Sequence, residues 1–265
     1  MGLAKGLRSL KGPAAPPYEN GPFEWDQHVT FQKPAVESYK RYTLEENFEK
    51  IPQLNATIDQ VYTTEAARVA NTSFEILGTN VADANITFAS TIGGIEIKTA
   101  TASADQAIVL PHLDTNYSAW TGIKWGTENQ VIWECVIRTD AITNIVIWAG
   151  LKLTNTSVIA TDDDQVMFRF DAAADTYWNM IDSIGGTDTA TISDVTVVAN
   201  TNYYFRIEID SDRKAHFFIN NQEKHISGAL TNDVDLIPYV GVQTATTAAK
   251  KINLVKEKIS RIIFE

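Results

Sequence analysis

The chain has 265 residues, of which 44% are hydrophobic and 21% are charged, and its formal net charge at pH 7 is -11. These proportions are those of a globular protein, and the acidic balance argues against coating DNA or RNA, which requires a basic surface. No apolar run approaches the roughly 20 residues that span a bilayer, and a single cysteine excludes a disulfide framework. We therefore expect no nucleic-acid partner and no membrane partner.

The N-terminal residues do not resemble a secretory signal. Residues 1–12 contain basic side chains but no continuous apolar stretch. We therefore expect the protein to be made in a cytoplasm, where the lone Cys135 stays reduced. Export by lysis or by a dedicated machine is compatible with this expectation.

Proline is concentrated near the N-terminus, with six of the eight prolines in the first 52 residues. Because proline fixes φ and lacks an N–H donor, this stretch is expected to be extended. It is also rich in aromatic side chains, which are costly to leave in water. We therefore predict that residues 1–55 form an extended arm that binds a partner, with an arm folded back on its own domain as the alternative. The predicted anchors are Tyr18, Phe23, Trp25, Phe31 and Tyr39.

One short helix is predicted at the end of this arm. Residues 43–46, with the sequence TLEE, match the capping box, in which a Thr hydroxyl and a Glu carboxylate satisfy backbone N–H groups at a helix start. The helix would run to about Lys50 and end before Pro52. Residues 56–72 are polar and are interpreted as a connector.

From residue 73 onward, apolar and polar residues alternate, as is typical of half-buried strands. Residues 130–139 place Trp133 and Cys135 on one face and Glu134 on the other. About a dozen such strands, with turns roughly every 8–12 residues, predict an all-β fold, an antiparallel two-sheet jelly-roll sandwich over residues 73–265. The expected strands include residues 74–77, 85–88, 94–99, 130–139, 144–153, 165–170, 189–198, 202–209, 215–219 and 251–265.

Several segments together carry a family resemblance. They are SAWTGIKWGTENQVIWECVIRTD (residues 118–140), IWAGLKLT (147–154), NYYFRIEIDSDRKAHFFINNQ (202–222), TNDVDLIPYVGVQT (231–244) and KISRIIFE (258–265). This set resembles the concanavalin A-like lectin/glucanase jelly roll, laminin-G-like sandwiches included. More narrowly, it is similar to the version found in structural proteins of tailed bacteriophages. The resemblance covers Thr87 to Glu265 and implies a non-enzymatic virion component displayed on a capsid or tail.

Glycoside hydrolysis is the activity most often found on this fold, and it needs two closely spaced carboxylates. The related glucanases carry a Glu-x-Asp-x-x-Glu motif. Here Glu208 and Asp210 begin such a motif, but Arg213 stands where the second catalytic Glu is required. Turn chemistry explains Asp210 and Asp212 without catalysis. We therefore expect the protein not to be an enzyme.

The densest acidic cluster consists of Asp162, Asp163 and Asp164. Oxygen-rich loops bind Ca²⁺, but three consecutive Asp side chains cannot all point at one ion. A solvated loop is the favoured interpretation, and a Ca²⁺ site is the alternative. No other cofactor is expected.

Aromatic side chains near strand ends are candidates for stacking on a sugar. Trp133 and Trp148 lie in alternating strands and are expected in the core. For the remaining aromatic residues, burial in the core or in an interface is the alternative. The candidate glycan contacts are Trp120, Trp125, Tyr177 and Trp178.

The sequence thus predicts a virion structural protein, a capsid decoration protein anchored through its N-terminal arm. Its expected partners are other virion proteins of the capsid or tail, in a multi-copy or homo-oligomeric assembly, and its expected location is the virion. The alternatives are a tail or fibre component, or a carbohydrate-binding adhesin that recognises a host surface glycan.

Overall fold

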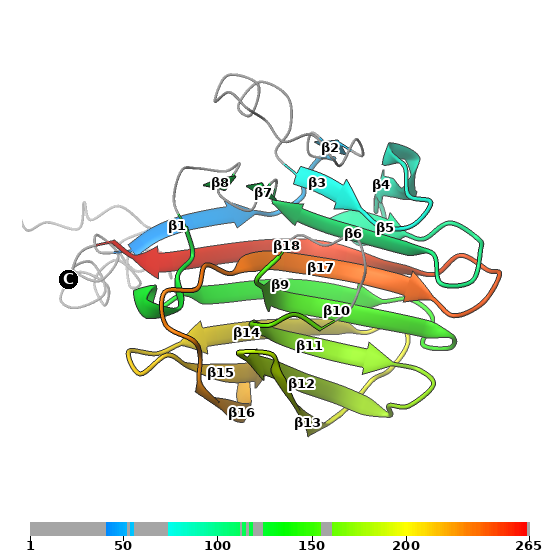
Figure 1. Ribbon diagram of the computed structural model, residues 1–265. Coiled ribbons are helices and arrows are strands. Elements are labelled where there is room, and N and C mark those ends of the chain that lie inside the picture. Colours follow the sequence, from blue (N-terminus) through cyan, green and yellow to red (C-terminus); the bar gives the residue numbers. More distant parts are fainter. Residues whose placement is uncertain are drawn as a thin grey trace, which may run out of the picture. The chain divides into compact units, whose positions relative to one another are not determined.

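The structure is a computed structural model that describes residues 41–51, 54–55, 74–111, 113–114, 117–118, 124–154 and 161–263. Residues 43–262 form one compact unit, which carries both sheets of the fold (Figure 1). The five predicted aromatic anchors of the arm and Trp120 lie outside the described residues.

The first sheet, called sheet A, joins strands from both ends of the chain (Figure 1). Strand β1 pairs with β18, outside the main strand order. The main order is β16 (Gln222–Ala229), β15 (Lys214–Ile219), β14 (Asn202–Ile209), β9 (Ile132–Thr139), β18 (Lys251–Ile262), β5 (Ile95–Lys98) and β4 (Ile86–Phe88), and β1 comprises Arg41–Glu46.

The second sheet, called sheet B, is antiparallel except for the pairing of its two-residue edge strand β2 with β3. Its order is β13 (Thr187–Thr196), β12 (Tyr177–Ile184), β11 (Gln165–Asp171), β10 (Ile145–Lys152), β17 (Ile237–Thr244), β6 (Gln106–Pro111), β3 (Phe74–Leu77) and β2 (Leu54–Asn55).

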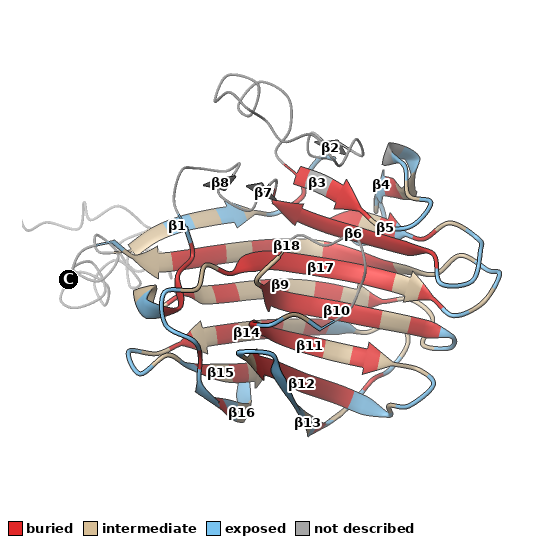
Figure 2. Cartoon of the chain, in the orientation of Figure 1, coloured by how far each residue is buried: buried red, intermediate tan, exposed pale blue. Residues whose placement is uncertain are grey.

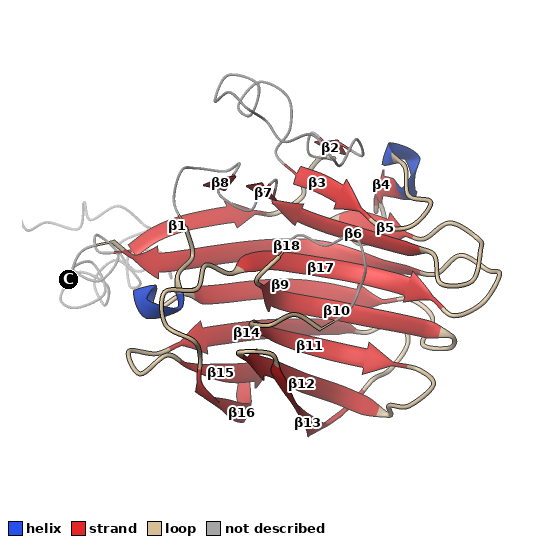
Figure 3. Cartoon of the chain, in the orientation of Figure 1, coloured by secondary structure: helices blue, strands red, loops and turns tan. Residues whose placement is uncertain are grey.

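The remaining described elements are short (Figure 3). They are the 3-10 helices η2 (Asp83–Asn85) and η3 (Thr127–Asn129) and the strands β7 (Leu113–Asp114) and β8 (Tyr117–Ser118). The predicted fold class, an all-β antiparallel two-sheet sandwich, is confirmed.

The core lies between the inner faces of the two sheets. Strands β9 and β14 are neighbours, and their apolar residues face inward in the predicted alternation, so that Cys135 lies opposite Phe205. Phe205 stacks on Phe168 of sheet B, with ring centroids 4.4 Å apart. Buried aromatic side chains of this kind supply much of the apolar area that stabilises a sandwich.

The predicted helix over residues 43–50 is wrong, because residues 43–46 belong to strand β1. Two contacts explain why the capping box does not form. The Lys256 ammonium donates a hydrogen bond to Glu45 over 2.6 Å, and the Glu46 carboxylate accepts one from the Phe48 backbone N–H over 2.8 Å. Phe48 is buried and packs against Phe74, with ring centroids 5.4 Å apart. Pairing with β18 and burial of Phe48 override the local helix signal.

Candidate functional site

The outer face of sheet B is apolar and buried. Because Phe168 points toward sheet A, its chain neighbours Met167 and Arg169 point away from it. Residues that pair with these two across the sheet share this outer face, for example Ile181 and Trp148. In Figure 2 most of β6, β10 and β17 is coloured as buried. The apolar cluster on this face consists of Leu77, Ile108, Leu110, Trp148, Met167, Ile181, Ile237 and Tyr239.

Several polar groups lie within this buried face. In the part of the chain that the structure describes, the Gln165 amide and the Trp148 Nε1 have no hydrogen-bond partner, and the Arg169 Nε lies 3.5 Å from an Asp175 carboxylate oxygen. Lys152 is almost fully buried, and its Nζ lies 3.9 Å from Asp162, while burial lowers its pKa. Buried polar groups therefore lie among the apolar side chains of this face.

The outer face of sheet A is polar and solvent-facing. Strand register places a row of polar residues across five adjacent strands, from β4 to β14. Residues in one cross-strand row share one face of a sheet, so their side chains can act on the same ligand. The row is Thr87, Glu96, Asn253, Arg138 and Asn202.

A cleft with a volume of about 330 Å³ is lined by three residues of this row, Glu96, Asn253 and Arg138. Its lining comes from the β4–β5 hairpin (residues 88–92), from the end of β9 (residues 138–140) and from Lys251 and Asn253 of β18. Asn253 is only 6% exposed, although it belongs to the lining. The cleft is therefore built by segments that are distant in sequence and adjacent only in the folded sheet.

The hairpin contributes two exposed apolar residues to a lining that is otherwise mainly polar. Phe88 is 42% exposed and Ile92 is 40% exposed, which is unusual for such large apolar side chains. The turn closes with a hydrogen bond from the Gly93 N–H to the Ala89 carbonyl, over 2.8 Å. Gly94 has a φ of +82°, and a Cβ there would lie 2.3 Å from the Leu254 carbonyl oxygen. Glycine thus lets the hairpin lie directly against β18.

The charges in the cleft are balanced. Lys251 Nζ donates a hydrogen bond to Glu96 over 2.8 Å, and this contact raises the pKa of Lys251, with Asp140 adding to the effect. Arg138 Nη1 donates to the Asn202 side-chain oxygen over 3.4 Å. Two cations and two carboxylates therefore line the cleft, on a chain with a net charge of -11.

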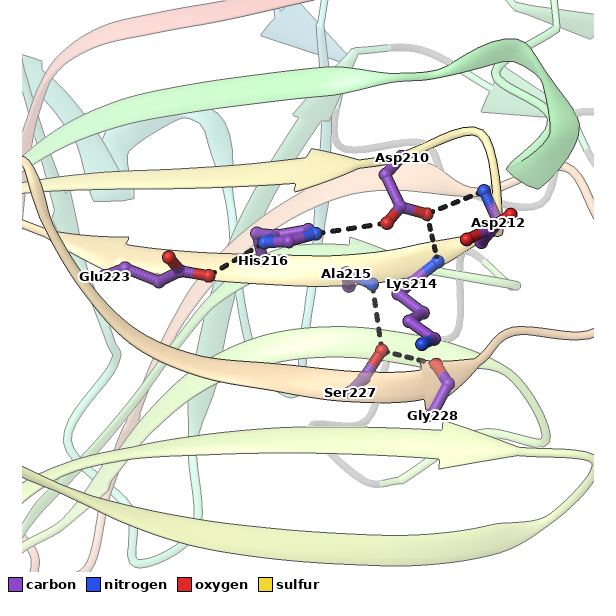
Figure 4. Close-up of polar contacts among 8 residues, drawn as sticks. All are labelled: Asp210, Asp212, Lys214, Ala215, His216, Glu223, Ser227 and Gly228. Carbon is purple, nitrogen blue, oxygen red and sulfur yellow. Dashed lines mark hydrogen bonds and ion pairs between the residues drawn. The ribbon is translucent and has the colours of Figure 1, made fainter.

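A second polar cluster lies at the edge of sheet A (Figure 4). The His216 ring is held between two carboxylates, with Nδ1 at 2.7 Å from Glu223 and Nε2 at 3.2 Å from Asp210. The other Asp210 oxygen accepts hydrogen bonds from the Asp212 and Lys214 N–H groups, over 2.8 Å each. The interpretation of Asp210 as a turn residue is confirmed.

The predicted Ca²⁺ alternative finds no suitable ligand set. The Asp162 carboxylate accepts hydrogen bonds from the Thr154 N–H and hydroxyl, at 2.9 and 2.6 Å. Asp164 is buried and accepts one from the Gly185 N–H. Over the described ranges, no group of three or more His, Cys, Asp or Glu side chains is arranged to hold a metal ion. These residues do not fit a calcium site.

The predicted glycan contacts are separated in the structure. Tyr177 is 40% exposed at the start of β12. Trp178 is buried, with its ring centroid 4.8 Å from that of Phe205, and Trp125 is buried as well. Sequence reasoning missed Phe88, Arg138 and Asn253, since only strand register brings them together.

Comparison with known proteins shows the fold. A β-glucanase from Bacillus licheniformis is 10% identical with a TM-score of 0.55, covering 82% of this chain and 97% of that one. A laminarinase from Rhodothermus marinus is 9% identical with a TM-score of 0.55, covering 83% and 97%. The carbohydrate recognition domain of Emp46p is 7% identical with a TM-score of 0.51, covering 82% and 95%. The fold is therefore the concanavalin A-like lectin/glucanase jelly roll.

Sequence comparisons add nothing to this assignment, since neither a family model nor a curated protein matches the chain. The concanavalin A-like part of the predicted resemblance is supported, and its bacteriophage part receives no support. Among the described residues, no helix has the length and apolarity needed to cross a membrane.

The structural neighbours also correct the expectation that the protein is not an enzyme. The β-glucanase and the laminarinase share its fold, so the lack of a glucanase motif at residues 208–213 does not exclude catalysis. At 9–10% identity, this likeness establishes the fold and leaves the activity open to test.

Proposed function

We propose that the protein binds carbohydrate in the cleft between the β4–β5 hairpin and the end of β9. The observation that carries the proposal is the composition of this cleft. Its lining combines the exposed apolar side chains of Phe88 and Ile92 with a row of carboxylate, amide and guanidinium groups. The carbohydrate-active and carbohydrate-recognising neighbours of the same fold support it as analogy.

The two kinds of side chain match the two surfaces of a sugar ring. A pyranose presents C–H groups on its faces and hydroxyls at its rim. Phe88 and Ile92 are exposed apolar residues of the lining that suit a C–H face, while Asn253 and Asp140 offer partners for hydroxyls. The volume of about 330 Å³ suits one or two sugar units.

Replacing the exposed apolar residue Phe88 tests this proposal. Wild-type protein, Phe88→Ala and Tyr177→Ala are titrated by calorimetry with a panel of neutral and acidic oligosaccharides. Tyr177 is the matched control, because its ring is similarly exposed but lies outside the cleft. We expect Phe88→Ala to weaken binding by about tenfold, equivalent to about 1.4 kcal/mol, and Tyr177→Ala to leave it nearly unchanged.

The reverse pattern would place the ligand at Tyr177, as the sequence predicted, and would overturn the cleft as the site. Binding of no oligosaccharide by wild-type protein would overturn the proposal itself. The titrated mixtures are also examined for shortened oligosaccharides, since enzymes share this fold.

The predicted role in a virion stays a prediction. Its anchors lie in residues 1–40, outside the described residues, and its partners and location were predicted from the resemblance to bacteriophage structural proteins. Glycan binding is compatible with such a role, because a surface protein of a particle can also attach it to a sugar-coated cell.

A further inference from the structure

We infer that the glycan bound in the cleft is acidic, and that its carboxylate pairs with Arg138. This inference rests on the proposed function and adds the chemical class of the ligand. Arg138 belongs to the polar row, with Asn253 opposite it on one neighbouring strand and Asn202 on the other.

The Arg138 guanidinium has N–H donors available to a ligand. A guanidinium presents five N–H donors in a planar fork that matches a carboxylate. Its hydrogen bond to Asn202, at 3.4 Å, uses one of these donors at the long end of the range. Within the described residues, no carboxylate lies within ion-pair distance of this guanidinium, although the residue lines the cleft.

Three lysines on the same face are paired with carboxylates. Lys251 pairs with Glu96 at 2.8 Å, and Lys258 pairs with Glu134 at 2.7 Å. Lys256 likewise contacts Glu45 at 2.6 Å. Arg138 differs from these three lysines because none of the described carboxylates forms an ion pair with it, and because it lines a cleft that can admit a ligand.

The remaining carboxylate of the cleft has a separate role in this arrangement. Since Glu96 and Lys251 neutralise each other, Arg138 and Asp140 are the charged groups left for a ligand. A sugar acid carries both a carboxylate and hydroxyl donors. Its carboxylate would pair with Arg138, while a hydroxyl would donate to Asp140.

Matched pairs of ligands test the inference. Trigalacturonic acid is compared with its methyl ester, which keeps the rings and removes the charge, and 3′-sialyllactose is compared with lactose. We expect at least one acid to bind wild-type protein about tenfold more tightly than its neutral counterpart at low salt. Arg138→Gln should abolish that preference, and Arg138→Lys should retain only part of it, because lysine keeps the charge but lacks the fork.

Lys98→Gln is the control for net charge, since Lys98 lies on β5 outside the cleft lining. It should leave the preference unchanged, and thermal melting confirms that every variant is folded. Equal binding of acids and neutral counterparts, or a preference that survives Arg138→Gln, would overturn the acidic ligand while leaving glycan binding intact. Failure of both members of every pair to bind would instead overturn the proposed function.

Discussion

Glu257 is a carboxyl group enclosed in the sandwich interior. It lies opposite the buried Cys135 on the neighbouring strand, and the Trp133 Nε1 donates a hydrogen bond to its Oε1 over 3.0 Å. Its other oxygen has no hydrogen-bond partner among the described residues. Burial raises the pKa of Glu257 to about 7, and the hydrogen bond from Trp133 opposes this rise only in part.

This carboxyl makes stability fall as pH rises. The native state holds this proton up to about pH 7, whereas the unfolded chain releases it near pH 4.5. The free energy of unfolding therefore falls as the pH rises between these two values, and the fall is complete above pH 7. The difference between these two pKa values corresponds to a loss of roughly 3 kcal/mol in the free energy of unfolding. Glu257→Gln should therefore be more stable than wild type at pH 8 and lack this slope. Urea unfolding from pH 5 to 8.5 measures the free energy of unfolding of both proteins. The same pH dependence in wild type and Glu257→Gln would contradict the raised pKa of Glu257.

His216 should add a second pH-dependent contribution. Partial burial lowers the pKa of His216, but the hydrogen bonds with Glu223 and Asp210 outweigh it, and the pKa is raised overall. The stabilisation is therefore fully present below about pH 6.5 and is lost as pH rises through the raised value. His216→Gln should be destabilised at pH 5.5 and nearly unaffected at pH 9. A loss of equal size at both pH values would show that packing, not charge, is responsible.

At the scale of elements, the β4–β5 hairpin depends on two glycines with different surroundings. Both have positive φ, but a Cβ at Gly93 would meet nothing within 4 Å, whereas one at Gly94 would collide with the backbone of Leu254. Gly93→Ala should cost about 1–2 kcal/mol from backbone strain alone. Gly94→Ala should cost more than about 3 kcal/mol and also weaken glycan binding, because the hairpin must move off β18. If Gly93→Ala and Gly94→Ala changed stability and glycan binding equally, the close approach of Gly94 to Leu254 would not have this role.

Strands were predictable from the sequence where one face is buried and the other is exposed to solvent, because apolar and polar residues then alternate. Strand β9 alternates strictly in burial, and its position was predicted from Trp133 and Cys135. Strands β6 and β17 were missed, because nearly all their residues are buried and no alternation remains to be detected. Strand β1 was misassigned because its helix-like local sequence is overridden by pairing with β18.

The candidate site was far less predictable than the fold. Phe88, Arg138 and Asn253 each look like ordinary strand residues, and nothing in their local sequence connects them. They line one cleft because β4, β5, β18 and β9 are consecutive strands of sheet A, although they are far apart in the sequence. Trp178, in contrast, is a residue type that often stacks on sugars, but it packs in the core against Phe205.

At the scale of the whole molecule, the two outer faces suit different environments. A two-sheet sandwich requires only its inner faces to be buried. The apolar cluster on the outer face of sheet B is buried in addition, whereas the outer face of sheet A is polar and carries an open cleft. We therefore expect a ligand from solution to reach sheet A.

Two truncations test where the folded unit begins. Residues 43–262 form the compact unit, and removing residues 1–40 leaves all of this unit in place. Removing residues 1–55 also removes β1 and the buried Phe48, and should cost roughly 3–5 kcal/mol. Urea unfolding of both proteins measures these changes. Equal stability of the two truncated proteins would show that β1 contributes nothing to the fold.

The most direct test of the central claim is a nuclear magnetic resonance titration of the full chain with a bound oligosaccharide, followed through its backbone amides. Ligand binding in the cleft predicts shifts concentrated in three segments, residues 88–92, residues 138–140 and residues 251–253. Shifts concentrated instead around Tyr177 or along the outer face of sheet B, with these three segments unchanged, would contradict the cleft as the carbohydrate-binding site.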